Sequence, residues 1–341
     1  MPQLVCDEKE VKQAIDRVVE RTFNMDFSWD WPGGVAFYGV TEAYEATGEE
    51  KYLQMIKDWM DEELEDGIPP LTVNASSIGH ILITLYQATK EERYLDIATQ
   101  MADFLLHDAE RFDDDVLQHT VNGGKYHFPE QAWVDTMFMA GYFLLRMGKL
   151  CERDDYFDMG LKQYHGHENF LQDDMTHLYY HGWDNINQNH MSGIFWGRGN
   201  AWAAITMARA LELIEVQHPS YMVIDCSLRD QQSALVRLQH ESGLWHTVLK
   251  DPSSYLETSG TAGIAASLFV RGKLYNKYIQ RAIEGLLAQV REDGSVMRVS
   301  AGTAVMNDAQ GYKDVPYKRV QGWGQGLMLV FLSSLLQTRL V

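Results

Sequence analysis

The segment YEATGEEKYL, residues 44–53, returns almost unchanged as YQATKEERYL at residues 86–95. Each copy ends one helix, passes through a short turn and opens the next helix on acidic residues, which suit the positive N-terminal end of a helix dipole. A repeat of about 40 residues with this content is typical of stacked helical hairpins. Weaker copies follow at residues 144–157, 211–222 and 267–279. The chain is therefore predicted to be a series of helical hairpins.

A second pattern precedes these turns: a loop rich in glycine, serine, asparagine or tryptophan that leads into an apolar helix. The copies lie at residues 29–40, 73–85, 129–145, 196–211, 255–270 and 320–336. These six units, with the turns between them, predict six inner and about six outer helices, closed into a ring rather than an open solenoid. The expected fold class is all-α, a toroid of six hairpins.

The ring also predicts where a site would lie. Small residues in the first turn of each inner helix let the helices approach one axis, so their N-terminal loops converge at one end. A site at that end would combine residues that are distant in sequence. Strand signals are few, and GLWHTVL (243–249) and GSVMRVSAG (294–302) are expected as minor β segments in the connecting loops.

The composition is that of an ordinary globular protein. Of 341 residues, 45% are hydrophobic and 23% charged, and no Pro/Gly/Ser-rich linker divides them, which favours one domain over residues 1–341. The formal net charge of −19 argues against nucleic acid or an anionic membrane as a partner held by charge. No apolar run reaches the roughly 18 residues that a membrane span needs. The N-terminus lacks a signal h-region and the three cysteines are far apart, so a cytoplasmic setting is expected.

The stretch SGIFWGRGNAW, residues 192–202, gathers polar and aromatic side chains on a glycine-rich turn before a helix. The unpaired N–H groups and positive dipole of a helix N-terminus suit an anionic ligand. The planar guanidinium of Arg198 matches a carboxylate. Trp196 and Trp202 offer flat apolar faces for a sugar ring. The alternative is that both tryptophans belong to the core, but tight loops on rigid scaffolds carry function more often than packing.

The third loop places a carboxylate in an apolar run, WVDTMFM (133–139). Asp135 is expected one turn into a helix, where burial makes ionisation expensive and raises its pKa, as a general acid requires. The alternative is an aspartate that interacts with a helix dipole, which predicts a lowered pKa. Lys125 lies upstream after two glycines and is either a group that reaches the same space or a solvated loop lysine.

Two histidines have a spacing that occurs in metal sites. His177 and His181 are at i and i+4, which suits metal ligands on a helix, but no third ligand has matching spacing and HGWDN (181–185) has the composition of a loop. No metal is therefore expected, and His181 is interpreted as a hydrogen-bonding contact for a ligand. Glu257 in the fifth loop is interpreted as structural, holding loop N–H groups. No nucleotide or other cofactor motif is present, and no cofactor is expected.

Five blocks of sequence together resemble one known family. They are FPEQAWVDTMFMAGYFL (128–144), HGWD (181–184), MSGIFWGRGNAWA (191–203), SGLWHTVLKDPSSYLETSGTA (242–262) and QGWGQG (321–326). In this order they resemble the unsaturated rhamnogalacturonyl hydrolases of glycoside hydrolase family 105, relatives of the unsaturated glucuronyl hydrolases of family 88. The resemblance runs from about residue 29 to residue 336 and implies an (α/α)6 barrel, in agreement with the six units.

The resemblance implies a substrate made by a polysaccharide lyase, an oligosaccharide whose non-reducing uronic acid carries a C4=C5 double bond. Asp135 is implied to protonate C4 and then to assist the water that adds at C5, so one carboxylate serves twice. The cationic contacts would hold the uronate carboxylate. The implied substrate contacts are Lys125, His181, Trp196, Arg198 and Trp202.

The sequence departs from the family pattern in the second hairpin. Related enzymes carry a second aspartate there, whereas this loop reads VNASSIGHIL (73–82), with Asn74 or His80 as candidates for that place. The first loop, SWDWPGGVAFYG (28–39), is expected to line the side of the leaving sugar.

Two other functions fit a ring of this kind. An inverting glycosidase that acts on saturated glycosides would need a second carboxylate, for which Glu257 and Asp184 are the candidates. A non-catalytic carbohydrate-binding toroid would keep the tryptophans without any need for an acid in apolar surroundings.

Overall fold

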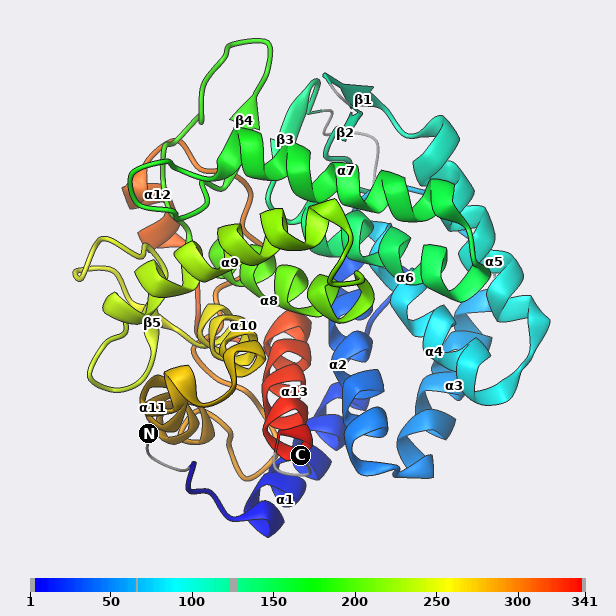
Figure 1. The fold of residues 1–341 in the computed structure, drawn as a ribbon. Helices are drawn as coiled ribbons and strands as arrows, with labels where there is room; N and C mark the ends of the chain where they lie inside the picture. The colour runs from blue at the N-terminus through cyan, green and yellow to red at the C-terminus, as the bar shows by residue number, and fades with distance from the viewer. Residues whose placement is uncertain (1–3, 66, 114, 123–127, 339–341) are drawn as a thin grey trace.

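The computed structural model describes residues 4–65, 67–113, 115–122 and 128–338, and its helices form two concentric rings (Figure 1). Within these residues six helices line the axis, and the last of them packs against the first, which closes the ring. This confirms the predicted toroid of hairpins. The inner helices are α2 (Trp31–Thr47), α4 (Gly79–Thr89), α6 (Phe143–Cys151), α8 (Gly197–Leu213), α10 (Thr258–Ser267) and α13 (Gly322–Gln337).

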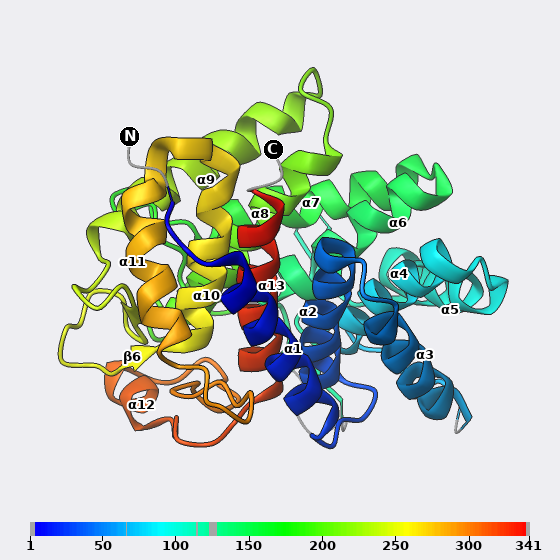
Figure 2. The same ribbon diagram turned by 90° about the horizontal axis from the view of Figure 1, so that it is seen from below.

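Six further helices of the described chain cover the inner ring and alternate with it along the sequence (Figure 2). They are amphipathic: α3, for example, buries Tyr52, Ile56 and Met60 and turns its charged residues outward. The count agrees with the predicted outer helices. They are α1 (Glu8–Phe23), α3 (Glu50–Glu65), α5 (Glu92–Asp103), α7 (Asp154–Leu171), α9 (Pro219–Arg237) and α11 (Asn276–Leu287).

The sequence repeat builds the contacts between neighbouring outer helices. In both strong copies the inner helix ends at a residue with left-handed backbone, Gly48 (φ 70°) and Lys90 (φ 60°), which reverses the chain. The tyrosine near the end of each copy then donates its hydroxyl to an aspartate on the preceding outer helix, and the weaker copy at 144–157 does the same. These pairs are Tyr52–Asp16 at 2.5 Å, Tyr94–Asp61 at 2.6 Å and Tyr156–Asp103 at 2.5 Å.

The inner ring is closed by glycines. A Cβ placed on Gly39 of α2 would lie 2.3 Å from the carbonyl oxygen of Gly326 in α13. One placed on Gly326 would lie 2.1 Å from the carbonyl oxygen of Val35, so these two helices meet backbone to backbone. Small residues thus bring these two helices together, but beyond the first turn, where the prediction had placed them.

Short strands and turns fill the loops at the N-terminal ends of the inner helices. The predicted segment 243–249 contains β5 (Trp245–His246), which pairs with β6 (Leu256–Glu257). The segment 294–302 was wrongly predicted: it makes one isolated bridge, and side chains take its N–H groups, Gln325 for Val296 and Glu257 for Ser300. The other short elements are η1 (Ala75–Ile78), η2 (Phe104–Asp108), β1 (Arg111–Phe112), β2 (Val116–Leu117), β3 (Gln131–Trp133), η3 (Met137–Tyr142), β4 (Gly182–Asp184), η4 (Leu268–Tyr275) and α12 (Ala309–Asp314).

In the part of the chain that the structure describes, no helix combines the length and apolar character needed to cross a membrane.

Candidate active site

Pairing of β3 with β4 brings the third and fourth loops together. Trp133 is opposite Gly182, and the N–H of Val134 donates to the carbonyl of His181 at 3.0 Å. From α8, the amide of Asn200 fixes the chain just before His181, because it accepts from Tyr179 N and donates to Tyr179 O, both at 2.8 Å. These bonds hold Asp135, His181 and the first turn of α8 in one place.

Asp135 and His181 face each other at the centre of this arrangement. Asp135 Oδ2 lies 3.4 Å from His181 Nε2, and the two side chains are 15% and 0% exposed. Among the described residues neither atom has a hydrogen-bond partner. On its far side, His181 Nδ1 lies 2.7 Å from the hydroxyl of Tyr312 in α12. Buried polar atoms without partners are rare in folded proteins and indicate a place where a ligand completes the bonding.

The predicted environment of Asp135 needs two corrections. It lies in the turn between β3 and η3 rather than one turn into a helix. Its pKa is lowered rather than raised. Burial alone raises that pKa, but contact with His181, and attraction by His181, His119 and Arg198, outweigh burial. The prediction considered the apolar neighbours in sequence and missed the basic groups that the fold brings in.

The histidines of the site are held neutral by burial. Burial lowers the pKa of His181, against an opposing effect of Asp135, and lowers the pKa of His119 to about 4. The ring of His119 stacks on Trp133 with centroids 4.4 Å apart. The site therefore combines a carboxylate with neutral imidazoles at neutral pH.

Aromatic rings enclose His181. Trp196 lies over it at 4.2 Å between centroids, and Trp133 meets it edge-on at 5.5 Å. The Nε1 of Trp196 is buried and has no partner in the described chain. Trp202 sits deeper, packed on Phe138 at 5.0 Å with 0% exposure, so its ring belongs to the core, although its Nε1 is also unpartnered. That Trp196 and Trp202 contact substrate stays a prediction.

Arg198 is oriented differently from the prediction. Both of its terminal nitrogens donate to the protein, so no fork is left open for a substrate carboxylate. It is 1% exposed and lies between the rings of Trp196 (4.5 Å) and Trp323 (5.4 Å). In this structure Arg198 holds the protein groups around it, and its direct contact with the uronate stays a prediction. Its acceptors are Ser259 Oγ, Ser300 O and Oγ, Ala301 O and Thr303 Oγ1.

The first loop joins this group through Trp31. Its ring stacks on Trp323 with centroids 4.4 Å apart, and Trp323 Nε1 donates to Ser300 O at 3.0 Å. Trp31, Trp323, Arg198 and Trp196 thus form a continuous stack across the end of the ring. That the first loop lines the leaving-sugar side stays a prediction.

Glu257 is structural, as predicted. It is the N-cap of α10, where Oε2 accepts from Gly260 N at 2.5 Å, and Oε1 accepts from Ser259 Oγ at 2.6 Å and from Ser300 N at 3.0 Å. Asp184 binds Asn187 within its own turn. Neither candidate for a second catalytic carboxylate is available for that task, which removes the structural basis for the two-carboxylate alternative.

The other residues that the sequence offered as candidates differ in where the fold places them. His177 and His181 do not share a helix, so the helical metal spacing was a wrong premise. His80 is buried beside Phe138 O and Arg146, on the far side of Phe138 from the site. Asn74, with Oδ1 buried and unpartnered among the described residues, is the better candidate for the place of the family's second aspartate. Lys125 lies outside the described residues.

Tyr312 is the site residue that the sequence interpretation missed. Nothing in its local stretch, GYKD (311–314), distinguishes it from a surface tyrosine. Only the fold, which carries α12 back over the site, places its hydroxyl on His181.

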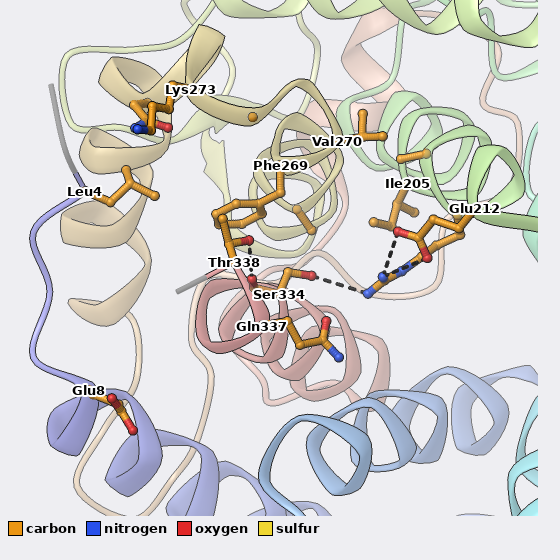
Figure 3. Close-up of a pocket in the computed structure, with 15 residues that line it drawn as sticks. Leu4, Glu8, Ile205, Glu212, Phe269, Val270, Lys273, Ser334, Gln337 and Thr338 are labelled. Carbon is orange, nitrogen blue, oxygen red and sulfur yellow. Dashed lines mark hydrogen bonds and ion pairs between the residues drawn. The ribbon is translucent and has the colours of Figure 1, made fainter. Parts of the chain in front are cut away.

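A hollow of about 1210 Å³ lies at the opposite ends of the inner helices (Figure 3). Arg209 there contacts Glu42, Glu212 and Ser334. Arg209 is thus one cation held between two carboxylates of the fold. The Asp135–His181 pair lies at the N-terminal ends of the inner helices and does not line this hollow.

A toroid of helical hairpins with a buried aspartate among tryptophans at its N-terminal end is the architecture of a glycoside hydrolase. Residues 5–339 match the sequence model of Glycosyl Hydrolase Family 88, and the chain belongs to that family. It is 63% identical over 339 residues to "Unsaturated rhamnogalacturonyl hydrolase YesR" of Bacillus subtilis (strain 168), covering 99% of this chain and 98% of that one. It is 24% identical over 250 residues to "Unsaturated 3S-rhamnoglycuronyl hydrolase" of Alteromonas sp. (strain LOR), covering 70% of this chain and 60% of the relative.

Solved structures agree with this assignment. The crystal structure of a possible member of the GH105 family from Salmonella enterica subsp. enterica serovar Paratyphi A str. ATCC 9150 superposes with a TM-score of 0.93 at 28% identity. The match covers 99% of this chain and 97% of that one. A possible GH105 member from Klebsiella pneumoniae subsp. pneumoniae MGH 78578 also gives 0.93, at 27% identity and with 99% and 96% covered. The resemblance seen in the sequence is thereby confirmed.

Proposed function

We propose that this protein removes the 4,5-unsaturated uronic acid from the non-reducing end of oligosaccharides released by pectin (rhamnogalacturonan) lyases. The observation that carries the proposal is the buried pair of Asp135 and His181, whose facing atoms lack hydrogen-bond partners in the described chain beneath Trp196. The name of the relative that is 63% identical supports the substrate class.

The chemistry needs one proton donor and one water. The unsaturated uronate is a vinyl ether, so transfer of a proton from Asp135 to C4 leaves an oxocarbenium shared by C5 and the ring oxygen. Water then attacks C5 and gives its proton to the Asp135 carboxylate, which restores the acid. The resulting hemiketal opens to a C5 ketone, and the hemiacetal freed at C1 expels the partner sugar as an alcohol. One carboxylate therefore suffices, in contrast to the usual pair of glycosidase carboxylates.

Because the pKa of Asp135 is lowered in the free enzyme, we propose that the bound substrate itself promotes protonation of this carboxylate. In the free enzyme the carboxylate is ionised at neutral pH. A bound uronate brings a second negative charge into a buried space, and a like charge nearby favours the protonated carboxyl. Substrate binding thus draws a proton onto Asp135, where the reaction consumes it.

The remaining roles in this proposal follow from the contacts. Trp196 forms an aromatic wall and offers its unpartnered Nε1 as a donor to the sugar. Arg198 holds segment 300–303 and adds positive potential without a direct bond to substrate. Trp202 contributes at most its Nε1, and Lys125 is proposed as the cation for the uronate carboxylate. The thiols of Cys151 and Cys226, which form no disulfide in the described chain, suit a cytoplasmic enzyme that receives imported oligosaccharides.

The test is a lyase digest of rhamnogalacturonan, followed by ultraviolet absorbance of the conjugated double bond. The proposal expects absorbance to disappear with the wild-type protein and to persist with Asp135→Asn. Persistence with the wild type, on galacturonyl and glucuronyl substrates alike, contradicts it. Hydrolysis of saturated glycosides by the same protein would restore the ordinary glycosidase alternative.

A further inference from the structure

Tyr312 lies behind the proposed catalytic pair and does not touch Asp135 in any described contact. Its hydroxyl is 2.7 Å from His181 Nδ1, 3.3 Å from Ser192 Oγ and 3.4 Å from the N–H of Met306. The side chain is 0% exposed. Tyr312, His181 and Asp135 therefore form a line of three groups, with the imidazole in the middle.

The donors and acceptors on this line fix where the hydrogens lie. The backbone N–H of Met306 can only donate, so it takes one lone pair of the Tyr312 oxygen. A phenol has one hydrogen, and the shortest contact of the Tyr312 oxygen is with His181 Nδ1. With that hydrogen donated to Nδ1, a neutral His181 carries its own proton on Nε2, the nitrogen that faces Asp135 Oδ2.

We propose that Tyr312 is a positioning residue for the hydrolysis proposed above: by donating its hydroxyl to His181 Nδ1, it keeps His181 neutral with Nε2–H directed at Asp135. This inference rests on the proposed function for its catalytic consequence, but not for its geometry. With both imidazole nitrogens committed, an incoming proton does not settle on His181. It goes to the carboxylate of Asp135, where the substrate can take it.

The other charged and titratable groups around His181 agree with a neutral imidazole. Arg198 of α8 disfavours a positive charge on it, whereas Asp135 favours one, and a charge on His181 would lower the pKa of His119 in the loop after β2. Trp133 and Trp196 cover its faces. Burial raises the pKa of Tyr312 to about 12, so the phenol keeps its hydrogen throughout the working pH range. Asp135 is thus the one group in this set that favours imidazolium, and the Tyr312 hydroxyl counters it.

The first experiment needs no substrate. Nitrogen-15 spectra of protein labelled at histidine distinguish the two neutral tautomers, and a His181→Gln sample identifies the signal. We expect wild-type His181 to carry its proton on Nε2, and Tyr312→Phe to give a higher His181 pKa, by roughly half to one unit. A wild-type proton on Nδ1, or an unchanged His181 pKa in Tyr312→Phe, overturns the inference.

The second experiment measures turnover across pH. In Tyr312→Phe the proton is partly retained by His181, so kcat falls roughly tenfold while KM stays within about twofold, and the alkaline limb of the profile moves to higher pH. Lys313→Gln is the matched control, because it releases α12 from Asp251 and Ser253 and leaves the contacts of Tyr312 with His181 unchanged. Equal profiles for the two variants would mean that Tyr312 only holds α12 in place, which overturns the inference.

The two experiments separate the inference from the proposed function. If the wild type leaves lyase products intact, the proposed function fails, while the histidine spectra still decide whether Tyr312 sets the tautomer. If turnover is normal but the spectra place the His181 proton on Nδ1, only the inference about Tyr312 fails.

Discussion

At the scale of single residues, the site is governed by the competition between burial and charge at Asp135. Burial of a carboxylate favours its protonated form, and contact with basic groups favours the ionised form. At Asp135 the basic groups win, since His181, His119 and Arg198 all lie close enough to lower its pKa. In the proposed mechanism the free enzyme therefore stores no proton on Asp135, and the proton arrives when the substrate binds.

Replacement of Asp135 tests whether the site depends on this one carboxylate. Asp135→Asn keeps the shape and removes the proton, so kcat/KM should fall by about three orders of magnitude or more. Asp184→Asn is the matched control, because the side chain of Asp184 bonds only to Asn187 in the described contacts, and the substitution should leave activity within a few-fold. Both are measured by the loss of double-bond absorbance, with circular dichroism melts to show that each variant is folded. Comparable losses in the two variants would contradict the assignment.

Proton uptake on ligand binding tests the second step of the argument. A saturated uronyl–rhamnose disaccharide carries the same carboxylate but no double bond, so it binds without reacting. At pH 7 its binding should take up a substantial fraction of one proton, because it raises the pKa of a carboxyl that is ionised in the free enzyme. Calorimetry in two buffers of different ionisation enthalpy measures the uptake, and Asp135→Asn should abolish it. Binding without uptake in the wild type would show that Asp135 gains its proton in another way.

The same protonation gives kcat/KM a definite pH dependence. This ratio reports the free enzyme, in which the pKa values of Asp135 and His181 both lie below their ordinary values. Activity should therefore already be declining as the pH rises towards about 6.5, whereas kcat, which reports the complex, should hold to higher pH. A kcat/KM that increases with pH through neutrality would exclude an acid role for the pair.

At the scale of elements, the N-terminus of α10 shows how the site is kept in shape. Glu257 caps this helix and also binds Ser300, whose carbonyl accepts from both Arg198 and Trp323. One buried carboxylate thus connects a helix end to the segment that crosses the site. Loss of such a group leaves several buried donors unpaired, and each unpaired donor costs about 1–3 kcal/mol.

Glu257→Gln separates this structural role from a catalytic one. The amide nitrogen of glutamine would face a backbone N–H in place of an acceptor, so the free energy of unfolding should fall by about 2–4 kcal/mol. The substitution of an exposed glutamate, Glu241→Gln, should change it by less than about 0.5 kcal/mol. Urea denaturation measures both. If Glu257→Gln were as stable as the wild type but lost activity a thousandfold, the two-carboxylate mechanism would be the better account.

The elements differ in how far the sequence could predict them. The hairpins were predictable because the repeat at 44–53 and 86–95 and the helical spacing of apolar residues are local signals. The pairing of β3 with β4 was not, because three-residue strands carry almost no pattern and their partner is distant in sequence. Asp135 itself could be predicted as a site residue from its local sequence. Its contact with His181 depends on the pairing of β3 with β4, so neither that contact nor the direction of the pKa change could be predicted.

Arg198 and Tyr312 both depend on contacts with residues that are distant in sequence, which local sequence does not predict. Arg198 stands in a motif typical of ligand sites and was predicted as a fork for a substrate carboxylate. Its actual acceptors, at residues 259 and 300–303, come from loops whose course the sequence does not give. Tyr312 has no local signal at all, and its position depends on the return of α12 over the site.

At the scale of the whole molecule, the ring encloses histidines as well as apolar residues. His80, His119, His167 and His181 are all buried, and burial lowers the pKa of each. A histidine that is neutral in the folded state but free to take a proton when unfolded makes stability depend on pH. Because the unfolded chain binds more protons below pH 6.5, acidification favours unfolding well before the carboxylates titrate.

His167 allows this effect on stability to be measured apart from catalysis. It lies on α7, and its Nδ1 is 2.8 Å from Gln163 O, with no hydrogen bond to Asp135, His181 or Tyr312 among the described contacts. Its pKa is about 4 in the folded protein, against an ordinary value of 6.5. The stability that it contributes is complete above pH 6.5 and is lost as the pH falls from 6.5 towards 4, by about 2 kcal/mol at pH 5. Urea denaturation at pH 7.5 and pH 5.0 should therefore show His167→Gln losing about 2 kcal/mol less than the wild type over this interval. His107→Gln, at an exposed position, should lose as much free energy of unfolding between pH 7.5 and pH 5.0 as the wild type. If His167→Gln also lost as much as the wild type, His167 would take up its proton without unfolding.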